Sequence, residues 1–223
     1  MMFAYDRIYL ADAMAVLAEF FDYAVSDYGA EGDEVADLFC ISSLSDMFAK
    51  GNPSVVSGMS GPELFERLSV ELGYDDAVLP EPLFRFEKTP DYWAGWVAAF
   101  IQWRLGISFD ELFRIMPYDD LIRLYHPWHE ASEERFCELF AEWARDSEVR
   151  APTRLARLRS GLRLSQRELA YRSGVGLRSI QMYEQRQKDI NKAQAQTLLR
   201  LSRVLYCSME DLMEPVFELD EVA

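Results

Sequence analysis

The sequence holds few of the residues from which metal sites and disulfide frameworks are built. It has three cysteines and two histidines among 223 residues. The cysteines, Cys40, Cys137 and Cys207, are odd in number and far apart, so they form neither a zinc-type pair nor a disulfide scaffold. We expect them to be reduced, buried thiols of a cytosolic protein.

The sequence also lacks a long apolar run. Its most apolar stretch, residues 93–101, is nine residues without a charged or amide side chain, whereas a helix needs about 20 residues to cross a bilayer. Residues 1–6 lack the basic and apolar regions of a secretory signal. These absences predict a soluble, cytoplasmic protein with no membrane partner, in which residues 93–101 belong to a buried helix.

No combination of side chains in the sequence is typical of an enzyme. His126 and His129 are three positions apart with Pro127 between them, and a metal site would require a third ligand group. The glycine-rich residues 51–61 precede a helix, but they lack the lysine and the spacing of a phosphate loop. Structural histidines and a solvated acidic surface are the simpler interpretation. We expect no enzyme, no metal and no cofactor.

Acidic side chains outnumber basic ones, but the two kinds are unevenly distributed along the chain. The formal net charge is −15, from 23 Lys and Arg against 38 Asp and Glu. Residues 1–150 carry 11 basic and 29 acidic side chains, a balance of −18, and residues 151–209 carry 12 basic and three acidic, a balance of +9. Residues 210–223 add −6. This asymmetry predicts an acidic block joined to a basic one.

Helical patterns are dense and strand patterns are nearly absent, which predicts an all-α protein. Residues 7–25 place apolar side chains at steps of three and four, and a second helix is predicted over residues 34–49. Capping boxes in residues 60–63 (SGPE) and 108–111 (SFDE) should open two further helices, because a Ser and a Glu three positions apart satisfy the first backbone N–H groups.

The domain boundary is predicted within residues 146–153, which are polar, contain a proline and lie where the charge changes sign. This gives an acidic multi-helix domain over residues 1–148 and a second domain over residues 149–223, which includes a short acidic tail. In the second domain the pattern tightens into five short helices. A third capping box, residues 165–168 (SQRE), should open the second of them, and the fourth is predicted over residues 192–205.

The motifs of residues 153–214 resemble the phage repressor/Cro family of helix-turn-helix domains, also called Xre-type. The matching positions are residues 164–170 (LSQRELA), Gly174, Val175, Ile180, Glu184, residues 198–201 (LLRL) and residues 207–212 (CSMEDL). The resemblance implies a five-helix fold whose third helix enters the major groove of double-stranded DNA, while surrounding Arg and Lys neutralise phosphates. Because one such helix contacts only a few base pairs, we expect a homodimer on an inverted repeat.

The resemblance assigns functions to five positions. Gln166 matches a glutamine that contacts the DNA backbone and helps to orient base contacts. Leu177, Arg178, Gln181 and Met182 occupy the groove-facing positions of the third helix. Arg178 is the candidate for a bidentate contact with guanine, and Gln181 for a contact with adenine or a phosphate. Leu177 and Met182 offer apolar contact, either to a thymine methyl group or, alternatively, to the core or a dimer partner.

Six basic side chains are candidate phosphate contacts, and a merely solvated charge is the alternative for each of them. They are Arg163, Arg167, Arg172, Arg186, Lys188 and Lys192. Two positions depart from the family's pattern. Gly176 stands where Ser or Thr usually caps the third helix, so that cap should be weaker. Arg186 stands where glycine usually follows the helix, so the next turn should be built differently.

The first domain carries no recognised motif. Trp93, Trp96, Phe100 and Trp103 predict a helix core or, alternatively, a ligand pocket or a partner face. Proteins similar to this family often join the DNA-binding domain to one that dimerises, senses a ligand or binds a second protein. We therefore expect a sequence-specific DNA-binding transcriptional regulator that acts as a repressor. The alternative is the antitoxin of a toxin–antitoxin operon, whose first domain neutralises a toxin while the second represses the promoter.

Overall fold

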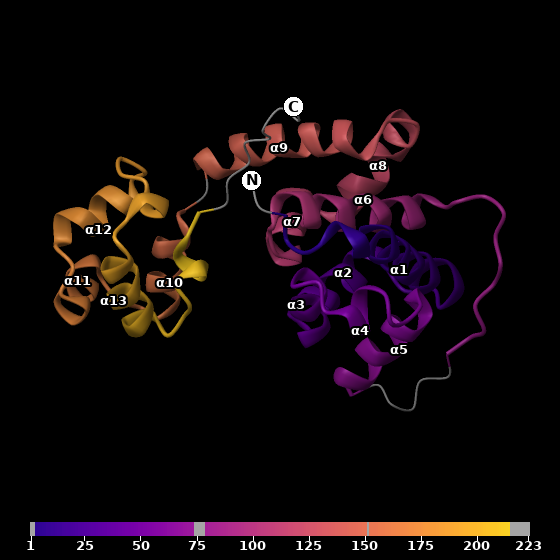
Figure 1. Ribbon diagram of the computed structural model, residues 1–223, viewed down its shortest axis with the longest axis horizontal. Helices are drawn as coiled ribbons and strands as arrows, with labels where there is room; N and C mark the ends of the chain where they lie inside the picture. The colour runs from indigo at the N-terminus through magenta and orange to yellow at the C-terminus, as the bar shows by residue number, and fades with distance from the viewer. Residues whose placement is uncertain (1–2, 74–78, 151, 215–223) are drawn as a thin grey trace. The chain divides into compact units, whose positions relative to one another are not determined.

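A computed structural model describes residues 3–73, 79–150 and 152–214 (Figure 1). Within these residues every regular element is a helix, which confirms the predicted all-α class. None of the described helices is both long and apolar enough to span a bilayer. The chain divides into two compact units between Ala144 and Arg145. We call them the acidic unit, up to residue 144, and the basic unit, from residue 145.

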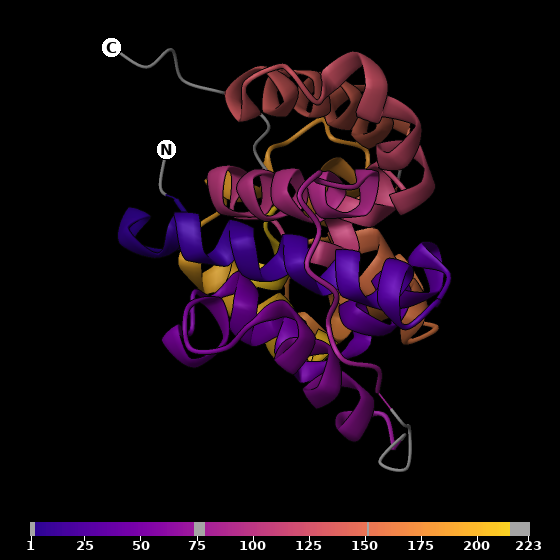
Figure 2. The same cartoon turned by 90° about the vertical axis from the view of Figure 1, so that its right-hand side faces the viewer.

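The helices of the acidic unit surround a central pair, α1 and α6 (Figure 2). The helices of this unit are α1 Leu10–Asp22, α2 Gly32–Ile41, α3 Ser43–Ala49, α4 Pro53–Val56, α5 Gly61–Glu71, α6 Pro90–Leu105, α7 Phe109–Ile115, α8 Tyr118–Trp128 and α9 Glu133–Arg150, which continues into the basic unit. The two units divide within α9, a few residues before the predicted boundary at 148/149. α5 packs on α1 and α8 packs on α6. Much of the core is aromatic, with Phe20, Phe21, Phe39 and Phe109 fully buried.

The close contact between α1 and α6 depends on Gly95. α6 is buried along most of its length, including the predicted core stretch at residues 93–101, of which Trp96 alone is partly exposed. A Cβ atom at Gly95 would lie 2.3 Å from the carbonyl oxygen of Leu17 on α1, well inside van der Waals contact. The glycine therefore lets the two helix backbones approach each other directly, and the rest of the unit packs around them.

One predicted helix is two helices in the structure. The helix expected over residues 34–49 is divided at Ser42 into α2 and α3. Ser42 has an extended backbone, and its hydroxyl accepts a hydrogen bond from the N–H of Ser45 at 3.2 Å as the N-cap of α3. This side-chain bond competes with continuation of the helix. The capping boxes predicted in residues 60–63 and 108–111 are both formed, and they open α5 and α7.

The basic unit has a core of its own. Its elements are α10 Arg154–Gly161, α11 Gln166–Ser173, α12 Leu177–Glu184, a 3-10 turn Ile190–Lys192, α13 Ala195–Leu205 and a second 3-10 turn Glu210–Leu212. The core contains one fully buried residue from each α-helix and one from the last turn, namely Leu155, Leu169, Ile180, Leu201 and Leu212. Two expectations need correction. The fourth helix begins at Ala195 because residues 190–192 form a separate turn, and the expected fifth helix is only a 3-10 turn.

We predict that Gly95→Ala destabilises the acidic unit. The added methyl group would overlap the α1 backbone, and overpacking of this kind costs about 1–3 kcal/mol, more than the ~1 kcal/mol by which alanine is favoured over glycine within a helix. The five tryptophans all lie at or before residue 143, so their fluorescence during urea unfolding reports on the acidic unit.

Gly161→Ala is the control for this substitution, because a Cβ atom at Gly161 meets nothing within 4 Å. Its tryptophan transition should coincide with that of the unmodified protein. If Gly95→Ala also unfolded at the unmodified midpoint, the two helices would not depend on their direct backbone contact.

Candidate nucleic-acid interface

Two short helices of the basic unit, α11 and α12, are joined by a tight turn. Ser165 and Glu168 form the predicted capping box of α11. The N–H of Glu168 donates to the Ser165 hydroxyl at 3.1 Å, and the N–H of Ser165 donates to the Glu168 carboxylate at 2.8 Å. α11 ends at Gly174, whose φ of +66° is a left-handed conformation that glycine adopts without steric cost. Gly176, the N-cap of α12, provides no side-chain hydrogen bond, in keeping with the weaker cap that was predicted. The short turn limits the angle at which α12 leaves α11.

The end of α12 is held by a buried ion pair with α10. Arg159 Nε donates to Glu184 Oε1 at 2.6 Å, and Arg159 Nη2 donates to Glu184 Oε2 at 2.9 Å. The two side chains are 16% and 6% exposed, so both charges are largely removed from water. The hydrogen bonds that the guanidinium donates to Glu184 raise the pKa of Arg159 above its ordinary value. A third bond runs from Arg159 Nη1 to the carbonyl oxygen of Leu164 at 2.7 Å. This bidentate pair fixes α12 against α10.

The same carboxylate positions Gln166, the first residue of α11. Gln166 Nε2 donates to Glu184 Oε2 at 2.7 Å. A glutamine amide has two N–H donors and an acceptor oxygen, so this bond orients the side chain and leaves further hydrogen-bonding capacity. Gln166 is predicted from the sequence as an interface residue, whereas Arg159 and Glu184, which position it, are not predicted to do so. The only indication in the sequence of this role was that Glu184 is one of the positions that match the helix-turn-helix family.

The four predicted groove-facing residues of α12 lie together on the accessible side of the helix. Leu177, Arg178, Gln181 and Met182 are linked by the three- and four-residue spacings that place side chains on one face of a helix. Arg178 is exposed and the other three are half-buried, while Ile180 on the opposite side is fully buried. The partly buried apolar side chains that pack against the core come from other positions. Leu177 and Met182 are therefore not core residues of this unit.

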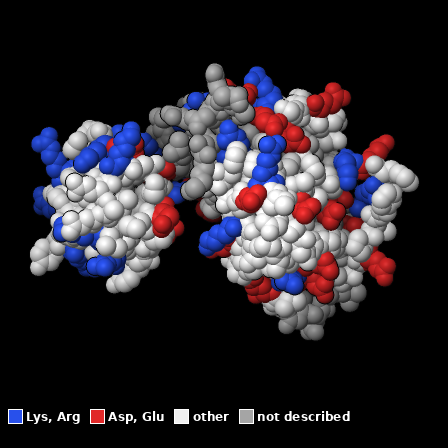
Figure 3. Space-filling model, viewed as in Figure 1, with Lys and Arg blue, Asp and Glu red and all other residues white. Residues whose placement is uncertain are grey.

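Five of the six predicted phosphate contacts are exposed side chains on or next to this helix pair. They are Arg163, Arg167, Arg172, Lys188 and Lys192. Lys188 Nζ lies 5.2 Å from the centroid of the Tyr183 ring, and Lys192 Nζ lies 3.4 Å from an Asp189 carboxylate oxygen in an exposed pair of little energetic weight. In Figure 3 the charged surface visible on the basic unit consists mostly of Lys and Arg. Such a surface attracts a polyanion.

Arg186, the sixth predicted phosphate contact, has a structural role. Its φ is +55°, so it adopts the left-handed conformation that glycine usually supplies at this position. The turn after α12 is therefore made by an arginine in a conformation that glycine adopts at lower steric cost. Its guanidinium lies 3.5 Å from the carboxylate of Glu214, which also accepts the backbone N–H of Arg154 at 2.7 Å. The Asn191 side chain pairs with the Glu214 backbone through two bonds of 2.8 Å. Arg186 thus helps to fasten Glu214 to the basic unit.

Comparison of the chain with family models, with curated proteins and with solved structures finds no match. The surface around α11 and α12 is therefore characterised by its own geometry and chemistry. It offers guanidinium, ammonium and amide donors on and around one accessible helix, which suits a ligand with phosphate oxygens and base-edge acceptors. In the part of the chain that the structure describes, no group of three or more His, Cys, Asp or Glu could hold a metal ion.

We predict that Glu184→Gln destabilises the basic unit by about 3 kcal/mol, because it leaves the buried Arg159 guanidinium without a counter-charge. Far-UV circular dichroism should show an earlier urea transition for part of the helical signal, while the tryptophan transition of the acidic unit stays in place. Glu168→Gln is the matched control, since glutamine can also complete a capping box at this exposed position. Equal shifts in the two variants would show that the buried pair contributes no more than a surface carboxylate does.

Proposed function

We propose that the protein is a sequence-specific DNA-binding transcriptional regulator that acts as a repressor. The basic unit is a repressor-like helix-turn-helix domain, and the acidic unit binds a partner or oligomerises. The observation that carries the proposal is the accessible side of α12, presented by a tight turn and held by the Arg159–Glu184 pair. The major groove is about 12 Å wide and admits one such helix. A helix held by a tight turn at its start and by an ion pair at its end can present the same side chains to every binding site.

Base recognition is assigned to the accessible side of α12. Arg178 has the length and the fork of donors to contact O6 and N7 of guanine, and Gln181 can pair with N6 and N7 of adenine. Leu177 and Met182 offer methyl and thioether surface to a thymine methyl group. Each good bidentate contact discriminates against a wrong base by about 1–3 kcal/mol, so two of them on one helix specify a short half-site.

Phosphate contacts are assigned to the exposed cations around α11 and α12. These are Arg163, Arg167, Arg172, Lys188 and Lys192. Gln166, oriented by Glu184 at the start of α11, is placed to add a hydrogen bond to the DNA backbone. We exclude Arg186 from this set because its guanidinium is paired with Glu214. Such contacts set the register of the protein on the duplex and supply affinity for any sequence.

An antitoxin would use the same two units in a different way. The acidic unit would neutralise a toxin, and the basic unit would repress the operon's promoter. The exposed apolar side chains Leu83, Phe84 and Phe86 of the acidic unit favour a protein partner. A toxin-like reading frame beside the gene, with growth arrest that is relieved by co-expression of this protein, would establish the antitoxin role. If the neighbouring gene encoded no toxic protein, the stand-alone regulator would be the remaining function.

We predict that the full chain enriches one sequence from a pool of random DNA duplexes and that binding weakens steeply with salt. On the selected duplex, Arg178→Ala should weaken binding by about 1–3 kcal/mol and relax the preference at one base position. Lys188→Ala should weaken binding to all duplexes alike and reduce the salt slope by about one. Fluorescence anisotropy titrations on selected and scrambled duplexes measure both effects.

Equal, sequence-independent losses in these two variants would reduce Arg178 to a phosphate contact. If the full chain bound no DNA duplex even at low salt, the proposed function would be overturned. Glu168→Gln changes the charge at a residue that is not an assigned contact, so it serves as the control and should keep the sequence preference.

We predict a dimer on an inverted repeat whose half-sites lie about 34 Å apart or a multiple of that distance. One recognition helix contacts too few base pairs for useful specificity in a genome, so two copies must act together. Footprinting on the selected duplex gives the spacing, and sedimentation of the complex gives the stoichiometry. A single copy that protects one asymmetric half-site with full affinity would contradict this arrangement.

A further inference from the structure

The segment that precedes α6 has an unusual placement of polar and apolar side chains. Residues 79–89, called here the strap, have no helical structure and pass beside the π-helical turn Tyr23–Asp27 that follows α1. The charged Arg85 is directed toward the body of the acidic unit. The apolar side chains of Leu83, Phe84 and Phe86 are 67%, 84% and 93% exposed. A loop is normally held by burying its apolar residues, as Leu79 does at the start of the strap, whereas the middle of the strap does the reverse.

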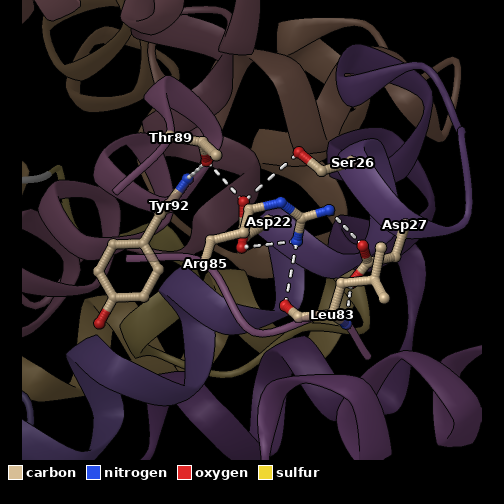
Figure 4. A network of polar contacts seen from close by, with 7 residues as sticks. All are labelled: Asp22, Ser26, Asp27, Leu83, Arg85, Thr89 and Tyr92. Atoms are coloured by element: carbon tan, nitrogen blue, oxygen red, sulfur yellow. Dashed lines mark hydrogen bonds and ion pairs between the residues drawn. The ribbon is translucent and has the colours of Figure 1, made fainter. Parts of the chain in front are cut away.

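Arg85 is held between two carboxylates of the body (Figure 4). Its guanidinium bonds to Asp27 and lies 3.5 Å from the carboxylate of Asp22. The Asp27 side chain is only 3% exposed, and it also accepts the N–H of Leu83 at 3.1 Å. Burial by itself would raise the pKa of Asp27, but the hydrogen bonds from Arg85 and Leu83 outweigh it and lower the pKa. Asp27 is therefore ionised at neutral pH and holds the strap at two points.

Both ends of the strap are fixed as well. The hydroxyl of Tyr23 donates to the carbonyl oxygen of Pro80 at 2.7 Å. The hydroxyl of Thr89 donates to Asp22 at 2.6 Å and accepts the N–H of Tyr92 at 3.0 Å as the N-cap of α6. The exposed side chains thus project from a fixed backbone. A partner that binds them has little backbone ordering to overcome, which lowers the entropic cost of association.

Phe84 and Phe86 form one exposed aromatic pair. They flank Arg85 and are largely exposed, whereas Arg85 points toward the body. Their ring centroids are 5.1 Å apart at an interplanar angle of 84°, an edge-to-face arrangement. Aromatic side chains bury roughly 150–250 Å² each when they are covered. A rigid pair of this kind is typical of a surface that another molecule covers.

A cavity of about 430 Å³ lies beside Phe84 and is rich in carboxylates. The acidic residues in its lining are Glu19, Asp22, Asp27 and Glu87, of which Glu19 and Glu87 are exposed. The two cations in the lining are already engaged. Arg85 pairs with the two aspartates, and Lys88 Nζ lies 3.7 Å from the centroid of the Tyr92 ring. Four carboxylates against two cations leave the surface next to the aromatic pair negative, so it suits a cationic side chain.

We propose that the strap is a docking surface for a basic, partly apolar segment of another protein. An aliphatic or aromatic side chain of that segment packs on Phe84 and Phe86, and a neighbouring Lys or Arg pairs with Glu19 and Glu87. The inference rests on the partner-binding role proposed above for the acidic unit and is independent of DNA binding. A second copy is poorly suited as the occupant, because residues 1–150 carry a net charge of −18 and two such surfaces repel each other.

The test is a selection of random peptides, displayed on phage, by the full-length protein at low salt. We expect the enriched peptides to combine Lys or Arg with Leu, Phe or Trp. In anisotropy titrations with these peptides, Phe84→Ser combined with Phe86→Ser should raise Kd by about tenfold or more. Glu19→Gln combined with Glu87→Gln should raise Kd by about threefold at low salt, and that difference should vanish near 1 M salt because the charges are screened.

Ile41→Ser combined with Val70→Ser is the matched control. These side chains are 75% and 55% exposed on α2 and α5 of the same unit, and their loss should leave Kd unchanged. The tryptophan unfolding transition verifies that each variant is folded. Recovery of no binding peptide, enrichment of peptides without basic residues, or equal binding by the Phe84/Phe86 variant and the unmodified protein would overturn the proposal.

A dimer in sedimentation that the Phe84/Phe86 variant abolishes would also overturn it, because a second copy would then be the occupant. Titration of the same variant with the selected DNA duplex separates the two proposals. If the Phe84/Phe86 variant bound both the DNA duplex and the peptide as the unmodified protein does, only the docking surface would be rejected. If the unmodified protein bound no DNA duplex, the proposed function would be rejected.

Discussion

A buried carboxylate held by a guanidinium organises the basic unit. Glu184 receives Arg159 from α10 and Gln166 from α11, so three helices meet at one charged group. None of them can shift without leaving a charge unpaired in a site with little access to water, which costs several kcal/mol, a large part of the stability of a small domain. The ion pair therefore acts as a geometric constraint more than as a source of stability. A surface that contacts bases needs that constraint, because hydrogen bonds tolerate only about half an ångström of variation in distance.

The acidic unit uses the same chemistry for a different purpose. Asp27 is as deeply buried as Glu184, and Arg85 reaches it from a segment without helical structure. In the basic unit the guanidinium comes from a helix whose apolar residues already lie in the core. In the strap Leu79 packs against the core, but the middle of the segment is held by the ion pair, so Phe84 and Phe86 are left on the outside. One type of contact thus fixes a helix in one unit and exposes an aromatic pair in the other.

Interactions between residues that are near neighbours in the sequence could be predicted, whereas contacts between residues far apart in the sequence could not. The capping box of residues 165–168 is recognisable because its two side chains are three positions apart. The break at Ser42 was missed because the apolar pattern continues across it and only its hydroxyl interrupts the helix. Glu184 finds its partners 25 and 18 positions away, and no local pattern specifies which arginine reaches it. The same limit applies to Arg186, whose pairing with Glu214 depends on how the chain returns after α13.

Three residues of the basic unit that carry a Cβ atom have positive φ values, a backbone conformation that glycine adopts more easily. Arg163, Arg186 and Tyr206 have φ values of +54° to +55°, a region that disfavours residues with a Cβ atom by roughly 1–2 kcal/mol. Glycine would relieve the strain at each position but would remove the side chain. The basic unit is therefore less stable than its fold allows. The difference resides in three backbone torsions, two of them at arginines, of which Arg186 pairs with Glu214.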